Sequence, residues 1–423
     1  MQEILFGYKL DPITWAYISA LMMIGIYFKF YRFWSVRNLD LAALISFSPA
    51  FLMMYHGLLH DKPELVPAGH VWLFAVSAFF LVRLLLDPVM VRRPLLEPNL
   101  SAGGLAFTGI SLLIFLMANV ITNPPERLEK LLSQQEVQGV SNPGYAPFYQ
   151  FSDFSNEVSS SDEQSRPHVH GNALRVAATR TAIILAHLLV VSGMVWIGFR
   201  HFDNIHTGIA AATLYLLAFY TSQFTRQMDH IVPAVFLVWA VAAYRRPMIA
   251  GVLIGLAAGM IYYPLFLIPL WCGFYWRRGL ARFLLGVVTV LSLLIVAMAL
   301  SAPDMGVFTI QLRQMFGLWN PFHAKFFGFW QYYDPAYRIP VLAAFVALCG
   351  SLTIWPAQKN LGTLLSCSAA VMLATQFWHA HLGGLCMAWY LPLLILTIFR
   401  PNLEDRVALS AVQPAWARRR QRD

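Results

Sequence analysis

Long apolar runs, separated by short polar connections, make up most of this chain. Runs of this kind predict helices that cross the roughly 30 Å hydrocarbon core of a bilayer. We expect about thirteen, at residues 13–33, 41–59, 70–87, 101–121, 179–199, 207–225, 230–244, 247–262, 264–276, 281–300, 338–355, 361–377 and 381–399. No small-residue cleavage site follows the first run, so we interpret it as a retained helix and not as a signal peptide. The pattern predicts an all-α polytopic membrane protein with about 12–13 transmembrane helices.

Basic residues gather in alternate connections between these runs. Cytoplasmic connections of membrane proteins are enriched in Lys and Arg, so the alternation predicts the orientation. We expect an outside N-terminus, a basic cytoplasmic tail at residues 400–423, and two long outer loops at residues 122–178 and 301–337. The sequence thus indicates a multi-pass protein of a bacterial inner (plasma) membrane. The clusters include Lys29, Arg32 and Arg37, then Arg92 and Arg93, Arg245 and Arg246, Arg277 and Arg278, and Arg418 to Arg420.

The composition agrees with this class and excludes a soluble domain. Of the 423 residues, 58% are hydrophobic and only 12% are charged, whereas about a quarter of a soluble domain is charged. The net charge of +9 follows from the cytoplasmic arginines and their contacts with anionic membrane lipids, so we expect no nucleic-acid partner. All four cysteines lie in apolar runs without paired spacing, which argues against disulfides and a thiolate metal site.

The stretch at residues 259–271 reads GMIYYPLFLIPLW, an apolar run interrupted by prolines. Proline lacks a backbone donor and clashes with the preceding turn, so Pro264 should end or kink the helix. Tyr262 and Tyr263 then lie at the outer surface, where phenolic side chains reach water. Irregular backbone at membrane depth occurs where it is buried in protein or lines a cavity. The hairpin is therefore a candidate part of an outward-facing site, although an ordinary short turn would give the same pattern.

Several short motifs surround this hairpin in a fixed order. They are Q-M-D-H at 227–230, an arginine pair at 245–246, A-G with a following glycine and alanine at 250–257, and Tyr-Pro at 263–264 with a further proline at 269. This order, from Met228 to Trp271, resembles the central part of the GT-C superfamily, the integral-membrane glycosyltransferases that use polyprenyl-phosphate sugars. The likeness is to its bacterial mannosyltransferase-like branch.

Two flanking stretches are also similar to that family. They are NPGYAPF at 142–148 in the first outer loop, and QFWHAHLGG followed by WYLPLL between Gln376 and Leu394. The resemblance covers a membrane core at residues 101–399 and leaves residues 1–100 as a three-helix N-terminal membrane extension, which we expect to dock a membrane protein partner. It implies transfer of a mannose-like hexose from a polyprenyl-phosphate donor to an extracytoplasmic lipid or glycan acceptor.

Such a transfer requires a carboxylate that takes the proton of the acceptor hydroxyl. The resemblance places this base in the first outer loop, where Glu126, Glu129 and Asp153 are candidates, each of which could equally be a solvated surface acid. Asp229 is a further candidate, because an acidic residue at the mouth of a membrane helix is costly unless it faces a cavity. An ordinary residue at a helix start explains Asp229 about as well.

The departing phosphate requires a cation or other donors. Family members often have a lysine before the hairpin proline, and this chain has Tyr262 and Tyr263 there. Arg226, Arg313 or Lys325 would have to supply the charge, or the protein is a non-catalytic relative.

Histidines and aromatic residues complete the predicted site. We expect its substrate-binding residues to converge on one outward cavity under the two long loops; they are His230, Tyr262, Tyr263, Trp378, His379 and His381. Two H-x-H pairs, at 168–170 and 379–381, suit a divalent metal, although no spacing fixes a coordination geometry. The alternative function is therefore a non-catalytic or a metal- or redox-cofactor-binding subunit of a membrane protein assembly.

Two further patterns give structural expectations. The second outer loop contains MFGLWNPFHAKFFGFWQYYDPAY, whose aromatic side chains would either form a lid that stacks on sugars or an interfacial aromatic belt. Arg83 and Asp87 are four residues apart on one helix and should pair with each other. A transporter is a weaker alternative, because only one interrupted helix is found where two related halves would have a pair.

Overall fold

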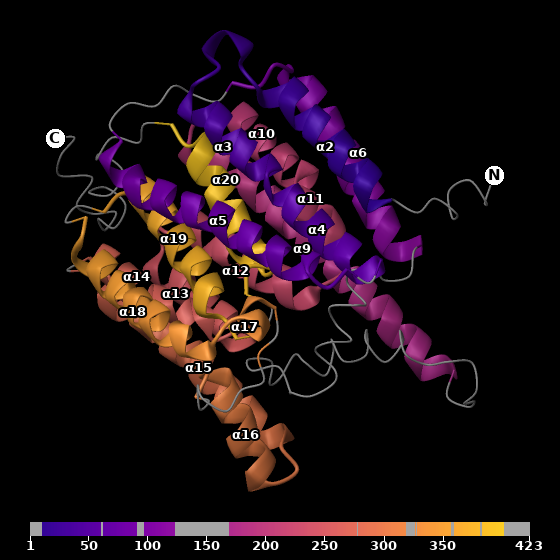
Figure 1. Ribbon diagram of the computed structural model, residues 1–423. Coiled ribbons are helices and arrows are strands. Elements are labelled where there is room, and N and C mark those ends of the chain that lie inside the picture. Colours follow the sequence, from indigo (N-terminus) through magenta and orange to yellow (C-terminus); the bar gives the residue numbers. More distant parts are fainter. Residues whose placement is uncertain are drawn as a thin grey trace, which may run out of the picture.

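The computed structural model describes residues 11–60, 62–90, 97–122, 169–276, 278–318, 326, 328–356, 359–380 and 383–401. The described chain is a bundle of helices without strands (Figure 1). Seven helices are long and apolar enough to cross a membrane, and five shorter apolar helices accompany them. The prediction of an all-α polytopic membrane protein is thereby confirmed.

The first half of the described chain contains helices α2 to α11. Their bounds are α2 (Pro12–Tyr27), η1 (Phe30–Arg32), α3 (Val36–Ile45), α4 (Phe47–Leu59), α5 (Leu65–Leu86), η2 (Asp87–Val89), α6 (Ala102–Thr122), α9 (Val169–His201), α10 (Ile205–Leu217) and α11 (Phe219–Gln223). Two predicted spans are each divided into two helices, at Ser46 and at Ala218. The break at Ala218 has extended backbone (ψ 129°) although no proline or glycine is present there.

The second half contains helices α12 to α20. Their bounds are α12 (Met228–Ala242), α13 (Pro247–Met260), η3 (Tyr263–Leu267), α14 (Ile268–Phe274), α15 (Leu280–Ser301), α16 (Met305–Met315), α17 (Phe329–Tyr332), η4 (Pro335–Tyr337), α18 (Arg338–Ile354), α19 (Leu361–Trp378), η5 (Met387–Trp389) and α20 (Leu391–Phe399). The predicted interruption is present, because α13 ends at Met260 and Pro264 lies in the 3₁₀ turn η3. The expected last span, 381–399, is helical only from η5 onward.

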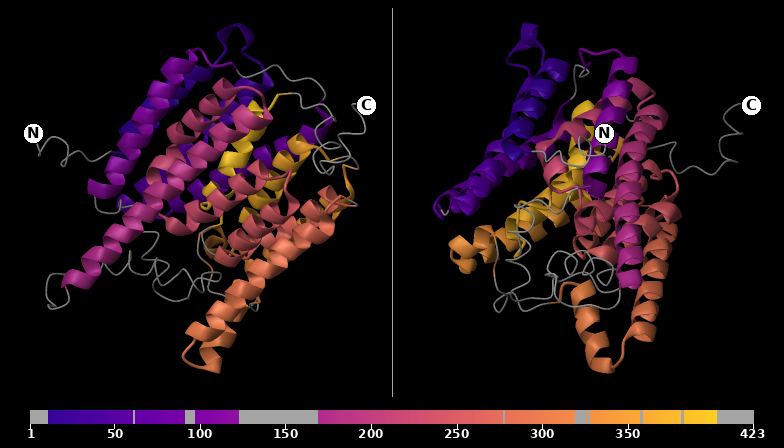
Figure 2. Two further views of the ribbon diagram at one scale, coloured as in Figure 1. Left: turned by 180° about the vertical axis from the view of Figure 1, so that it is seen from behind. Right: turned by 90° about the vertical axis from the view of Figure 1, so that its right-hand side faces the viewer.

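Short helices occupy the middle of the bundle and longer ones surround them. In α19, 94% of the membrane-length window is buried, against 28% in α6 and α15. The surrounding helices α9 and α15 project beyond the central ones at one end (Figures 1 and 2). We call this the tyrosine–histidine end, because Tyr262, Tyr263 and His379 lie there. The opposite end, with Arg245 and Arg400, is the arginine end.

Glycines bring α13 and α15 into close contact, and these two helices run side by side. A Cβ atom on Gly251 would overlap the carbonyl of Phe283, and one on Gly286 would overlap the carbonyl of Met248. Small residues permit this approach of two backbones, which is a common way to pair helices in a membrane. The position of α13 matters for the site because the Tyr262–Tyr263 hairpin follows it directly.

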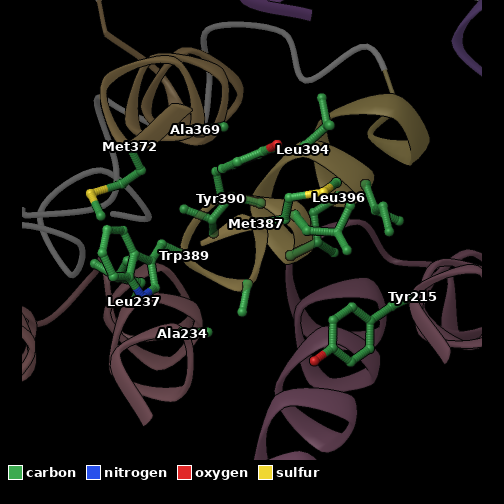
Figure 3. Close-up of a cluster of buried hydrophobic side chains, with 14 of the residues drawn as sticks. Tyr215, Ala234, Leu237, Ala369, Met372, Met387, Trp389, Tyr390, Leu394 and Leu396 are labelled. Atoms are coloured by element: carbon green, nitrogen blue, oxygen red, sulfur yellow. The ribbon is translucent and has the colours of Figure 1, made fainter. Parts of the chain in front are cut away.

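The N-terminal helices share one hydrophobic core with the rest of the chain. The Tyr27 hydroxyl donates to the carbonyl of Ala210 at 2.8 Å, and the Phe51 ring packs 6.0 Å from the ring of Tyr220. Figure 3 shows the central part of this core, where side chains of α10, α12 and α19 meet those of η5 and α20. The described part of residues 1–100 therefore packs on the predicted core and does not stand apart from it.

A buried ionic network closes the arginine end. Arg83 donates to both carboxylate oxygens of Asp40, at 3.1 and 3.2 Å, and to Asp87 at 3.1 Å. Arg400 donates twice to the other oxygen of Asp87, at 2.6 and 3.0 Å. All four side chains are 9% exposed or less. The predicted Arg83–Asp87 pair is thus present, and it belongs to a larger network that joins α3, α5 and the end of α20.

Candidate functional site

Four chain segments meet at the tyrosine–histidine end and form the candidate site. They are the start of α12, the hairpin after α13, the end of α19 and the turn η5. Extended backbone sets two of these boundaries, since Gln227 precedes α12 with ψ 103° and His379 ends α19 with ψ 127°. The chain therefore leaves the helical path at both points.

Tyr262, Tyr263 and His379 form a hydrogen-bonded chain. The Tyr262 hydroxyl donates to the Tyr263 hydroxyl at 2.8 Å, and the Tyr263 oxygen lies 2.6 Å from His379 Nδ1. The Tyr263 hydroxyl donates to Nδ1 when the neutral His379 ring has its proton on Nε2, and accepts from Nδ1 in the other tautomer. The chain thus couples the two hydroxyls to the protonation of the His379 ring.

A second tyrosine–histidine pair lies nearby. The Tyr220 hydroxyl is 2.6 Å from His230 Nδ1, and both side chains are buried. His230 Nε2 lies 3.7 Å from a carboxylate oxygen of Asp229 and 3.6 Å from the sulfur of Cys386. The Asp229 side chain is 25% exposed, so its carboxylate is the part of this group that is open to the surroundings.

Trp389 lies between the two pairs. Its ring centroid is 5.2 Å from that of Tyr263, 5.8 Å from that of His379 and 6.3 Å from that of His230. Its indole N–H donates to the backbone carbonyl of Asp229 at 3.2 Å. This fully buried ring therefore fixes the start of α12 relative to the hairpin, and Figure 3 shows it beside Leu237 and Met372.

The turn that positions Trp389 is fixed by Gln376 of α19. Its side-chain oxygen accepts hydrogen bonds from the backbone N–H groups of Gly384, at 3.1 Å, and Cys386, at 3.2 Å. Gly384 has φ +91°, which side chains other than glycine rarely adopt. Gln376 is fully buried, so the turn rests on a rigid support.

Arg338 at the start of α18 provides a cation beside the tyrosines. Its guanidinium donates twice to the carbonyl of Trp378, at 3.1 and 2.9 Å, and lies 4.8 Å from the ring centroid of Phe326. The Trp378 ring is 5.4 Å from that of Tyr263, so the charge is held next to the hairpin. The side chain is half-buried, which strengthens its electrostatic effect relative to a charge in water.

Described parts of the second long loop, residues 301–337, cover this end of α19. Gly317, with φ +64°, lies directly against the Tyr262 ring, where a Cβ atom would come within 2.7 Å of it. The indole N–H of Trp330 donates to the carbonyl of Phe377 at 3.0 Å, and Phe329 stacks on Phe74 at 4.1 Å. These parts of the loop are thus packed against the site.

The structure places several predicted site residues together and others apart. Asp229, His230, Tyr262, Tyr263, Trp378 and His379 belong to one cluster around Trp389. Arg226 lies three residues before Asp229, and its guanidinium donates to the carbonyl of Asn119 at 2.7 Å. Arg313 is exposed on the last turn of α16. Glu126, Glu129, Asp153, Lys325 and His381 lie outside the described residues.

Several residues of the cluster were not predicted. Tyr220, Gln376, Cys386 and Trp389 lie in apolar runs, where each resembles a packing residue, and Arg338 is far from the hairpin in sequence. His56 and His60 form a further pair, with ring centroids 4.3 Å apart, and their spacing of four on one helix was a readable signal. Among the described residues, no three His, Cys, Asp or Glu side chains are placed to hold a metal ion.

The arrangement combines an acid–base group, donors and aromatic surfaces. Asp229 can accept a proton and His230 can assist it, because the carboxylate and the ring nitrogen are close. Arg338 supplies donors of the kind that stabilise an anion. The chain matches no protein-family model, no curated protein and no solved structure.

Proposed function

We propose that this protein is a membrane glycosyltransferase that moves a mannose-like hexose from a polyprenyl-phosphate donor to an extracytoplasmic lipid or glycan acceptor. One observation supports it most. Asp229 and His230 of one helix, the Tyr262–Tyr263 hairpin and His379 are distant in sequence, and they meet around one tryptophan at one end of a helical bundle. These are the positions to which the resemblance assigned the site.

The proposal gives each group a role. Asp229, or a carboxylate of the first outer loop, takes the proton of the acceptor hydroxyl. Arg338 pairs with the donor phosphate in place of the lysine that the hairpin lacks, which is consistent with its fixed position beside Trp378. Aromatic rings of the second outer loop stack on the sugar.

The topology belongs to the same proposal. The arginine end faces the cytoplasm of a bacterial cell, and the tyrosine–histidine end faces outward. The central helices that end at the site are short, for example about 22 Å for the 15 residues of α12, so the site is recessed below a roughly 30 Å bilayer surface. A polyprenyl phosphate could then enter from the lipid side.

The test is transfer of radiolabelled mannose from synthetic polyprenyl-phosphate mannose in proteoliposomes. We expect Asp229→Asn to reduce transfer by about 100-fold or more if Asp229 is the base. Asp304→Asn is the matched control, because Asp304 is an exposed helix cap outside the cluster around Trp389 and Asn caps a helix equally well. Asp153→Asn separates the first-loop alternative from Asp229.

The same assay also distinguishes the proposed function from the alternative one. If the wild type transfers neither mannose nor any other polyprenyl-linked hexose, the glycosyltransferase proposal is wrong. The alternative is then a non-catalytic or cofactor-binding membrane subunit. Bound divalent metal and a co-purifying protein partner would be measured next.

A further inference from the structure

A groove separates helices α2 and α6 on a side of the bundle that the candidate site does not use. Its volume is about 560 Å³, within the range of 300–1,000 Å³ typical of ligand sites. It lies between residues 11–22, at the start of α2, and residues 107–115 of α6. None of these residues belongs to the elements around Trp389. The two helices are drawn side by side in Figures 1 and 2.

The groove opens toward the region that lipid occupies. On its borders Phe107 is 74% exposed and Ile18 is 41% exposed, and both belong to apolar helices. Solvent does not reach such side chains in a bilayer, so the groove must be filled by a hydrocarbon chain or by protein. Eleven residues of α2 span about 16 Å, which suits one acyl chain lying along the helix.

Among the described residues that line the groove, Asp11 is the one charged side chain, and it lies at one end. Asp11 and Thr14 lie at the start of α2, where the Asp11 carboxylate caps the helix by accepting from the Thr14 backbone and hydroxyl, each at 3.0 Å. Away from Asp11 the lining is formed mainly by Ile18, Met22 and Leu112. It also contains the hydroxyls of Thr108 and Ser111, and Thr108 donates within its own helix to the carbonyl of Gly104 at 2.9 Å. A phospholipid has the same order of groups, with a charged head at one end and an apolar tail behind it.

Trp15 provides a second, independent indication of a ligand. Its side chain is only 5% exposed, lines the groove, and is stacked on Phe115 at 6.0 Å. Its indole N–H has no hydrogen-bond partner among the described residues. Buried indole N–H groups usually have a partner, and one without costs free energy. An acceptor in the groove one helical turn along α2 from Asp11 would satisfy it, and the ester carbonyls of a lipid whose headgroup lies at Asp11 are acceptors of this kind.

We propose that this groove binds a phospholipid with an ammonium headgroup, such as phosphatidylethanolamine. One acyl chain lies between α2 and α6, an ester carbonyl accepts from the indole N–H of Trp15, and the ammonium pairs with the Asp11 carboxylate. The negative charge of Asp11 disfavours an anionic headgroup at the same place. This lipid site is separate from the proposed transfer reaction and does not depend on it.

The test uses phosphatidylethanolamine with a photoreactive group on its acyl chain, added to membranes that contain the full chain. Cross-linked peptides are identified by mass spectrometry. We expect labelling of α2 and α6 in the wild type. Ser111→Trp fills the groove and should reduce this labelling about tenfold, whereas Ile114→Trp, on the 64% exposed face of α6 outside the groove, should not change it.

Two conservative variants keep the test decisive if Ser111→Trp does not fold. Trp15→Phe retains an aromatic ring and removes the indole N–H, and should weaken labelling about two- to tenfold. Asp11→Asn retains the helix cap and should remove the preference for phosphatidylethanolamine over phosphatidylglycerol.

Three results would overturn the proposal. One is equal labelling in Ser111→Trp and Ile114→Trp. Another is a wild type that labels equally with phosphatidylglycerol, which would exclude the ammonium–carboxylate pairing. The third is the absence of label on α2 and α6 in native membranes, which would mean that another occupant, such as a partner helix, fills the groove.

Discussion

Replacing Gly251 with alanine should separate α13 from α15. The added Cβ would overlap the carbonyl oxygen of Phe283, which is part of the opposing backbone and cannot rotate away. The helices must therefore move apart or shift along each other. Gly25 of α2 is the matched control, because a Cβ atom there would meet no heavy atom within 4 Å.

We expect the two substitutions to change the free energy of unfolding in opposite directions. Overpacking of a tight contact costs about 1–3 kcal/mol, and replacing glycine by alanine inside a helix returns up to about 1 kcal/mol. Because the overlap is with backbone, the upper part of the overpacking range, about 2–3 kcal/mol, applies, and Gly251→Ala should destabilise the protein by about 1–2 kcal/mol after the helix-propensity gain of about 1 kcal/mol. Gly25→Ala should be neutral or stabilise it by up to about 1 kcal/mol, because only the helix-propensity gain applies.

The measurement is the apparent Tm of the purified protein in detergent micelles, followed by tryptophan fluorescence. A free-energy change of 1 kcal/mol shifts Tm by about 2–4 °C in proteins of 150–250 residues, so a chain of this length should show slightly smaller shifts. We expect Gly251→Ala to melt below the wild type and Gly25→Ala at or above it. Gly350→Ala on α18, also without a neighbour within 4 Å, is a second control.

The reasoning fails if Gly251→Ala melts at the same temperature as Gly25→Ala. That result would mean that α13 and α15 adjust without cost, and that the glycine contact does not set their spacing. The functional readout is separate. A displaced α13 moves the Tyr262–Tyr263 hairpin, so transfer should fall in Gly251→Ala even below its melting temperature.

Three further predictions concern the ionic network and the site. Asp87→Asn removes the charge between two arginines and should cost about 3–5 kcal/mol, measured by thermal denaturation, with Arg400→Met in the same chain restoring part of it. Tyr263→Phe breaks the hydroxyl chain and should cost about 1–3 kcal/mol and reduce transfer, whereas Tyr17→Phe on the exposed face of α2 should do neither. Arg338→Gln should raise KM for the polyprenyl-phosphate donor about tenfold, and an unchanged KM would exclude its phosphate role.

The helices could be predicted from the sequence because lipid exposure demands long apolar runs. Their interruptions were predicted only where proline marks them, as at Pro264. The break at Ala218 has no such signal, and its backbone is extended because α11 turns away from α10 to pack on the N-terminal helices. Tertiary contacts fix that turn, and composition does not encode them.

The site was predicted in part, for a similar reason. Tyr262, Tyr263, Asp229 and His379 are polar residues at helix ends, and such positions stand out in an apolar chain. Trp389 is the residue around which they gather, yet it lies in an apolar stretch where a tryptophan is ordinary packing. Its function as a spacer depends on the Gln376 hydrogen bonds that shape its turn, and these form only in the folded chain.

The ionic network and the candidate site are connected through α20. This helix begins two residues after Trp389 and ends one residue before Arg400, and all nine of its residues are buried. Eleven residues at 1.5 Å each place Trp389 about 17 Å from Arg400 along a nearly rigid rod. The pairing of Arg400 with Asp87 therefore holds one end of this rod, and the Gln376 hydrogen bonds hold the end at Trp389. Loss of that pairing should disturb the site from the opposite end of the bundle.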